Sequence, residues 1–199
     1  DVTTASGLLP LPTKAPHVEI ADMDNDGWPD IVTSASSGDG TRPAVFRNLG
    51  LDDGIPRFEE PTGLGDPQYW VAGPTGDMDR DGRLDLLLVE FEPSLPSLLM
   101  RNETASGNWL EVWLGVEADG IGSRVVVYEP RGSSGSDGRL LGSAGITAAR
   151  GYSAGVAAIA HFGLGDVEIV DVVVRLPGGG EFVERDVPAN RHIRLPAGC

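Results

Sequence analysis

Cysteine is almost missing from this 199-residue chain, whose one cysteine is Cys199, the last residue. A single cysteine cannot form an internal disulfide, so Cys199 is a free thiol, a link to a second molecule, or merely the point at which the sequence stops. Zinc prefers cysteine or clustered histidine ligands, and the three histidines are scattered. The sequence therefore indicates neither a disulfide-stapled fold nor a zinc site.

Positive charge is also scarce, because 15 Lys and Arg stand against 30 Asp and Glu and leave a formal net charge of -15. This charge would repel phosphates, so we expect no nucleic-acid partner. No apolar run approaches the roughly 18 residues of a membrane span. No signal peptide is visible, and the start at Asp1 is typical of a mature secreted chain or a fragment of one.

Long helical patterns are missing as well, whereas glycine (28 residues) and proline (15 residues) are frequent. This composition favours an all-β fold of many short strands joined by turns. Strands are predicted at residues 17–21, 31–35, 44–48, 57–60, 69–72, 85–91, 97–102, 109–114, 123–129, 139–146, 155–162, 168–176, 181–187 and 191–195. The last seven runs fit an antiparallel sandwich or barrel.

Aspartate is abundant, at a spacing that occurs twice. The stretch Asp22-Met23-Asp24-Asn25-Asp26-Gly27-Trp28-Pro29-Asp30 recurs 55 residues later as Asp77-Met78-Asp79-Arg80-Asp81-Gly82-Arg83-Leu84-Asp85, with six of nine positions identical. Four carboxylates in nine residues repel one another, so this spacing favours a hard cation between them. Calcium is the natural candidate, because magnesium requires a stricter octahedron and usually keeps several waters.

The two stretches predict two calcium sites with equivalent ligands. Calcium takes about 6 to 8 oxygens, which water would complete. The predicted ligands of the first site are Asp22, Asp24, Asp26, Asp30 and the carbonyl of Trp28. Those of the second site are Asp77, Asp79, Asp81, Asp85 and the carbonyl of Arg83. Gly27 and Gly82 would allow the chain to turn at a positive φ.

The acidic stretches have two other interpretations. An EF-hand loop ends in a bidentate Glu at its twelfth position, where this chain has Thr33 and Leu88, and long helices flank it. The flanks here are short β-prone runs, which excludes an EF-hand. Solvated Asp/Gly turns are the other alternative, but the recurrence at a fixed register favours metal binding.

The repeat extends beyond the acidic loop, because Phe46-Arg47-Asn48 and Met100-Arg101-Asn102 follow their loops at nearly the same distance. A repeat of about 55 residues is typical of a propeller or array. The two units resemble FG-GAP or VCBS repeats, the calcium-binding blades of integrin-α-like propellers. A closed propeller needs several more blades, so either the chain is a fragment or the repeats form a compact open sheet.

The C-terminal part resembles the ASPIC/UnbV domain that follows such repeats in the cartilage acidic protein 1 family. The segments that carry this resemblance are Asn108-Trp109-Leu110, Gly120-Ile121-Gly122-Ser123-Arg124-Val125, Gly151-Tyr152-Ser153, His161-Phe162-Gly163-Leu164-Gly165 and Val174-Arg175-Leu176-Pro177-Gly178-Gly179. Leu176 replaces the tryptophan of the family's Trp-Pro segment, and the loop at residues 131–138 looks enlarged. The resemblance implies an extracellular, calcium-dependent interaction protein without established catalysis.

These patterns divide the chain into three parts. Residues 1–16, with three prolines, are expected to form an extended N-terminal arm. Residues 17–104 are expected to hold the two calcium-binding repeats, and residues 105–199 a β-sandwich-like domain. Asn102-Glu103-Thr104 is a sequon for N-glycosylation, and such triplets often arise by chance.

A catalytic site is a weaker interpretation. Gly151 to Gly155 fit a nucleophile elbow around Ser153, with Asp171 or Asp186 and then His192 in hydrolase order. An elbow requires a helix and a large parallel sheet, whereas the remaining 44 residues have strand patterns. We predict that the chain is not an enzyme. His161 is predicted to be a structural residue with a satisfied hydrogen bond, and Trp109 and Trp113 to share one strand face within the core.

The sequence thus predicts a secreted, calcium-stabilised binding or structural module of the adhesion or extracellular-matrix type. Its partner would be a protein or a glycan. The alternative is a subunit of an extracellular filament or surface layer, in which the partner is another copy of the chain. Open sheet edges invite strand addition from a neighbour, and residues 1–16 would be the donated arm.

Overall fold

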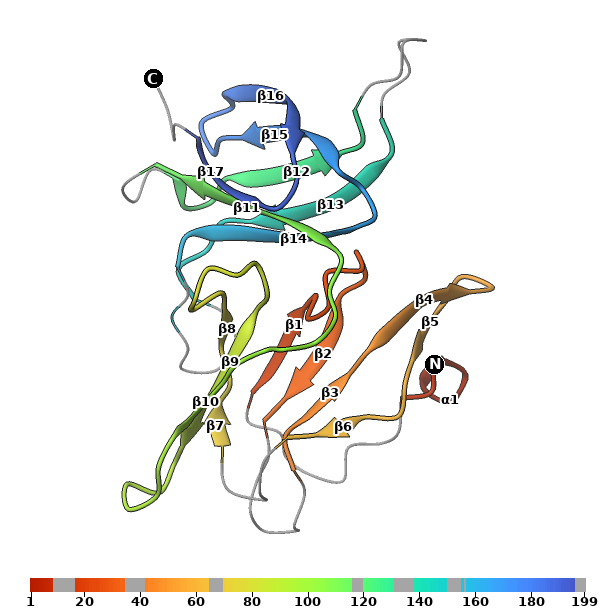
Figure 1. Ribbon diagram of the computed structural model, residues 1–199, viewed down its shortest axis with the longest axis vertical. Helices are drawn as coiled ribbons and strands as arrows, with labels where there is room; N and C mark the ends of the chain where they lie inside the picture. The colour runs from red at the N-terminus through yellow and green to blue at the C-terminus, as the bar shows by residue number, and fades with distance from the viewer. Residues whose placement is uncertain are drawn as a thin grey trace. The chain divides into compact units, whose positions relative to one another are not determined.

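The structure is a computed structural model that describes residues 1–8, 17–34, 42–64, 70–115, 120–130, 138–149, 155 and 157–195 (Figure 1). The side chains of residues 70 and 71 are not described. Ser153, Cys199, residues 9–16 and most of the loop at 131–138 lie outside these ranges. The chain is nearly all β, as predicted, and forms two compact units.

The first unit contains Asp1–Met23, Trp28–Thr104 and Ala149–Gly155. Its first sheet has the order β1-β2-β3-β6, formed by Val18–Ala21, Asp30–Thr33, Ala44–Phe46 and Thr62–Gly63. Its second sheet has the order β10-β9-β7, formed by Leu98–Met100, Asp85–Glu90 and Trp70–Ala72, and β8 (Thr75–Gly76) also pairs with β9. A separate hairpin joins β4 (Asn48–Asp52) to β5 (Ile55–Phe58). Each acidic stretch connects two adjacent antiparallel strands, β1 with β2 and β8 with β9.

The core of the first unit is small. Val32 of β2 and Leu86 and Leu88 of β9 are buried in one cluster. Side chains at every second position of a strand share a face, so Leu86 and Leu88 point to the same side of their sheet. Partly buried Met23, Val45, Leu64, Leu98 and Met100 pack against this cluster. Both repeats therefore contribute to one shared core.

The second unit contains Asp24–Gly27, Ala105–Ala148 and Val156–Cys199. One sheet has the order β14-β11-β17, formed by Ile159–Gly165, Asn108–Leu114 and Arg191–Leu195. The other has the order β13-β12-β15-β16, formed by Leu140–Gly145, Arg124–Tyr128, Ile169–Arg175 and Glu181–Pro188. A large cluster of buried aliphatic side chains from both sheets fills the space between them, which makes the unit a sandwich.

Two features of the fold differ from the sequence prediction. β11 and β17 pair in parallel, so the sandwich is not purely antiparallel. Thr3–Ser6 form a short helix, α1, in the arm that was predicted to be extended. Asp1 Oδ1 accepts hydrogen bonds from the Thr3 backbone and hydroxyl at 3.0 and 2.7 Å, and Gly7 ends the helix at φ 80°. These local contacts outweigh the weak helix propensity of Thr.

Trp109 and Trp113 do share one face of β11, but that face is not the sandwich core. Alternation along the strand directs Leu110, Val112 and Leu114 into the core cluster instead. Trp113 is 37% exposed, whereas Trp109 is 9% exposed. The prediction that both tryptophans are core residues was therefore wrong for Trp113.

Candidate metal centre

The two acidic loops have the same backbone conformation at equivalent positions. Gly27 and Gly82 adopt φ 93° and 87°, which confirms the predicted turns. Asn25 and Arg80, two residues earlier, also have positive φ, at 56° and 64°. Asn tolerates this left-handed region better than Arg, so the shared geometry was not evident from Arg80. The repeat is thus conserved in shape even where the side chains differ.

Three carboxylates of each loop converge. In the first loop, Asp22, Asp24 and Asp30 each offer one oxygen, and these oxygens lie within 4.8 Å of one another. In the second loop, Asp77, Asp79 and Asp85 do the same. Such groups, built from oxygen donors alone, have the chemistry that a hard cation such as Ca²⁺ requires. The described residues therefore contain acidic clusters that fit a metal ion.

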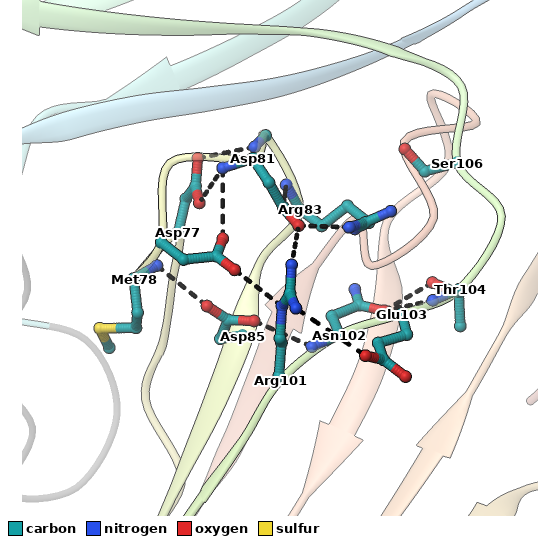
Figure 2. Close-up of polar contacts among 12 residues, drawn as sticks. Asp77, Met78, Asp81, Arg83, Asp85, Arg101, Asn102, Glu103, Thr104 and Ser106 are labelled. Atoms are coloured by element: carbon teal, nitrogen blue, oxygen red, sulfur yellow. Dashed lines mark hydrogen bonds and ion pairs between the residues drawn. The ribbon is translucent and has the colours of Figure 1, made fainter.

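Asp26 and Asp81 are not members of these converging groups of described residues. In the second loop the reason is visible: Asp81 Oδ1 accepts a hydrogen bond from Arg83 N at 3.0 Å, and Oδ2 pairs with the Arg83 guanidinium. Arg101 adds a contact of 3.4 Å to the same oxygen (Figure 2). Burial raises the pKa of Asp81, but the hydrogen bonds and charge of Arg83 and Arg101 outweigh it and lower the pKa below its usual value.

The last aspartate of each loop closes the loop onto the strand pair. Asp30 accepts a hydrogen bond from Met23 N at 2.8 Å on one oxygen and from Asn48 N at 2.7 Å on the other. Asp85 does the same with Met78 N at 3.0 Å and Asn102 N at 2.9 Å. We call each such Asp–Asn pair, Asp30–Asn48 and Asp85–Asn102, a loop clamp. Since a carboxylate oxygen has two lone pairs, the clamp does not prevent metal coordination.

The clamp asparagines were not identified as functional residues from the sequence. Asn48 Nδ2 donates to Pro29 O at 2.9 Å, and Asn102 Nδ2 donates to Leu84 O at 3.1 Å. The signal was present, because each asparagine ends a Phe/Met-Arg-Asn segment at nearly the same distance from its loop. The repeat pattern alone assigns no role to this last residue.

Asn102 also connects the two repeats and occupies the possible glycosylation site. Its Nδ2 donates to Met23 O at 2.7 Å as well as to Leu84 O, so both amide hydrogens are used (Figure 2 shows its surroundings). Thr104 N donates to Asn102 Oδ1 at 3.1 Å. An N-linked glycan would replace one of the Nδ2 hydrogens, so the folded first unit favours an unmodified Asn102.

The backbone of the second loop is organised by its own carboxylates. Asp77 Oδ1 accepts from Asp81 N at 3.0 Å, and Asp77 Oδ2 accepts from Gly82 N at 2.9 Å (Figure 2). Asp79 Oδ1 also accepts from Asp81 N, at 3.3 Å. These bonds hold the carboxylates on the inner side of the loop and satisfy backbone donors that a turn leaves without partners.

The second unit contains a polar cluster that the sequence did not reveal. Glu111 is 4% exposed and lies opposite His161 of β14 and His192 of β17 in the strand registers. Its oxygens lie 3.5 Å from His161 Nδ1 and 2.7 Å from His192 Nδ1. Trp109 packs beside both imidazoles, with ring centroids 6.4 and 4.8 Å away. Burial raises the pKa of Glu111, but hydrogen bonds to and attraction by the two histidines lower it below its usual value.

His161 forms a side-chain hydrogen bond, as predicted. Its Nε2 lies 2.8 Å from Asn25 Oδ1, within the second unit, and this hydrogen bond holds the ring. Asn25 is fully buried, and its carbonyl accepts from Gly165 N at 2.8 Å. The segment 24–27 is therefore fixed by side-chain and backbone bonds inside this unit.

The predicted catalytic arrangement is not supported by the contacts of its described members. Ser153 lies outside the described residues. The acid that contacts His192 is Glu111, whereas Asp171 accepts hydrogen bonds from Arg185 at 2.9 Å and from Asp186 N at 3.1 Å. Among the described residues, His192 and Asp171 thus have partners other than those of the predicted triad.

Both regions of the chain are similar to known proteins. Residues 22–88 match the model of an FG-GAP-like repeat, and residues 115–198 match the model described as ASPIC and UnbV. The chain is 31% identical over 196 residues to cartilage acidic protein 1 of Homo sapiens and 32% identical over 200 residues to that of Mus musculus. Each alignment covers 92% of this chain, and the chain spans 28% of each relative. No helix among the described residues is long and apolar enough to cross a membrane.

Proposed function

Because the chain combines FG-GAP-like repeats with an ASPIC and UnbV region, as the sequence resemblance predicted, we propose that it is an extracellular, calcium-stabilised binding or structural module without catalysis. The observation that carries the proposal is the likeness of the two acidic loops. Both have the same backbone geometry, and each has its own group of converging carboxylates and its own loop clamp. The names of the relatives, cartilage acidic protein 1, describe no enzyme and fit a matrix setting.

Calcium would stabilise the fold by neutralising each loop. Asp22, Asp24 and Asp30 would hold one ion, and Asp77, Asp79 and Asp85 the other, with backbone carbonyls and water completing the shell. The ion supplies positive charge where the loop carboxylates repel one another. At about 1 mM calcium and a dissociation constant near 0.1 mM, each site adds about 1.4 kcal/mol to the free energy of unfolding. This is a sizeable part of the stability of a domain whose apolar core is small.

The experiment is a calcium count by native mass spectrometry, combined with thermal unfolding in calcium and in excess EDTA. We expect two ions per chain and a clearly lower melting temperature after chelation. Asp24→Asn and Asp79→Asn should each remove one ion and part of the thermal shift. The matched control is Asp53→Asn, which removes the same charge from an exposed turn at φ 50°, where Asn is tolerated. A wild-type chain that binds no calcium and melts at one temperature in both buffers would refute the proposal.

The surface beside the first loop supports a binding role. The Trp28 ring is 40% exposed and lies over Gly50, where an added Cβ would be 3.2 Å from the ring. On the same strand, β4, Leu49 and Leu51 are 53% and 58% exposed. Exposed apolar groups gathered on one hairpin are typical of an interaction surface. A protein or glycan partner that uses this hairpin would bind next to a calcium loop, so calcium removal should weaken its binding.

Self-assembly is the second candidate, and β1 is the feature that favours it. Among the described strands β1 pairs with β2 alone, and its Val18 and Ile20 are 44% and 55% exposed. An edge strand with exposed apolar side chains can accept a strand from another copy. Light scattering at increasing protein concentration tests this. Polymers that persist after deletion of residues 1–16 would exclude the arm as the donated strand.

A further inference from the structure

Arg101 forms ion pairs with carboxylates that the second loop would need to bind a cation. Its Nε is 2.7 Å from Asp79 Oδ2, and its Nη2 is 3.4 Å from Asp81 Oδ2. Its Nη1 is also 3.9 Å from Glu103 Oε1. Figure 2 shows the guanidinium reaching from the strand end after β10 to the side chains of the loop. Asp79 is one of the three residues whose oxygens converge, so Arg101 is bonded to a candidate metal ligand.

We propose that Arg101 is an internal competitor for the cation of the second loop and lowers the calcium affinity of that site. This inference rests on the proposed function. A guanidinium bond to Asp79 Oδ2 occupies a lone pair of a carboxylate that a metal would coordinate. A positive side chain beside the site also repels a divalent cation. Calcium must therefore displace Arg101 or share Asp79 with it.

The two loops differ in charge before Arg101 is considered. Each has four aspartates, but the second also carries Arg80 and Arg83 where the first has Asn25 and Trp28. The formal charge is thus -4 for residues 22–30 and -4 + 2 = -2 for residues 77–85. The less negative loop attracts a divalent cation less strongly, so this difference also lowers the calcium affinity of the second loop.

Arg101 is more important for the metal than Arg83 because of the carboxylates they contact. Arg83 pairs with Asp81, which is outside the converging group, whereas Arg101 binds Asp79, which is inside it. Arg101 is also 58% exposed. Exposed ion pairs are weak, so calcium can displace this side chain at a moderate cost in affinity. The arginine would thus set the calcium concentration at which the second loop fills.

The test is a calorimetric calcium titration of the full chain, in which Asp24→Asn first disables the other loop. Against this background we expect Arg101→Gln to lower the dissociation constant of the second loop on the order of tenfold. Arg101→Lys keeps the charge but loses the planar fork, so we expect a decrease of about threefold. The matched control is Arg175→Gln, because Arg175 forms an equally exposed pair with Glu181 at 2.9 Å in the other unit. It should leave the titration unchanged.

Thermal unfolding provides a second measurement. In excess EDTA Arg101→Gln should melt below wild type, because the loop carboxylates lose a counter-charge, and added calcium should close this gap. Equal or weaker calcium binding by Arg101→Gln would overturn the inference while leaving the proposed function intact. If that variant does not fold, an unchanged dissociation constant in Arg101→Lys would overturn it equally. If the wild-type chain binds no calcium, both the proposed function and this inference are wrong.

Discussion

The two units of this chain are stabilised in different ways. In the second unit, fully buried aliphatic residues such as Leu110, Val125 and Val172 from facing sheets form a continuous core. In the first unit the buried core cluster comprises Val32, Leu86 and Leu88, while buried Asp30 and Asp85 clamp the loops by hydrogen bonds. The comparison teaches that hydrophobic burial specifies the second unit, whereas the first depends on polar contacts and on the charge state of its loops.

The largest effect is expected from the core of the second unit. Leu110 is fully buried, and Leu110→Ala should lower the free energy of unfolding by about 2 to 5 kcal/mol through lost burial and a residual cavity. The control is Leu140→Ala on β13, because Leu140 is 56% exposed. Chemical denaturation in calcium and in EDTA measures both. If the loss of unfolding free energy in Leu110→Ala differed greatly between calcium and EDTA, the two units would not be stabilised in different ways.

The next effect should come from a loop clamp in the first unit. Asp85→Asn places an amide donor opposite Met78 N or Asn102 N and removes a charge-assisted hydrogen bond, which costs about 1.5 to 3 kcal/mol. Asp30→Asn should have a similar effect because its bonds are equivalent. Both variants should also bind calcium less tightly in a titration. Normal stability for either one would mean that the clamp is not required.

These two predictions also mark where sequence reasoning succeeded. The strands from β11 to β17 were located because alternation of apolar and polar residues is a local pattern with period two. Leu110, Val112 and Leu114 illustrate it, since all three face the core. The acidic loops were located because their ligand types stand at a fixed local spacing. Each pattern can be read within about ten residues of sequence.

Contacts between distant residues were not predicted. Glu111 meets His161 and His192 because β14 and β17 flank β11, and the parallel pairing of β11 with β17 cannot be read from spacing. Likewise, Arg101 contacts Asp79 because β10 pairs with β9 and the chain then passes the loop. Such contacts depend on strand order and register, which are set by the whole fold.

A glycine substitution tests how tightly the segment 24–27 is held in the second unit. An added Cβ at Gly107 would lie 2.4 Å from Asn25 O and 2.9 Å from Gly165 Cα, both of them backbone atoms. We expect Gly107→Ala to cost about 1 to 3 kcal/mol by overpacking. Gly145→Ala is the matched control, because no atom lies within 4 Å of its added Cβ. Equal stability of the two variants in chemical denaturation would show that residues 24–27 can shift to accommodate the added Cβ at little cost.

The smallest expected effect is the dependence of the second unit on pH, which separates the buried charge cluster around Glu111 from the apolar core. Because the pKa of Glu111 is lowered from 4.5 in the folded chain, folding favours its ionised form. Its stabilising contribution is therefore fully present above about pH 4.5 and is lost as the pH falls through the lower folded value. Glu111→Gln cannot ionise, so its stability should fall less steeply below this pH. The measurement is the unfolding free energy from pH 6 to pH 3, and parallel curves for the variant and wild type would contradict the assignment. Because the acidic loops of the chain also carry carboxylates, unfolding should be followed by tryptophan fluorescence, to which Trp109 beside this cluster contributes.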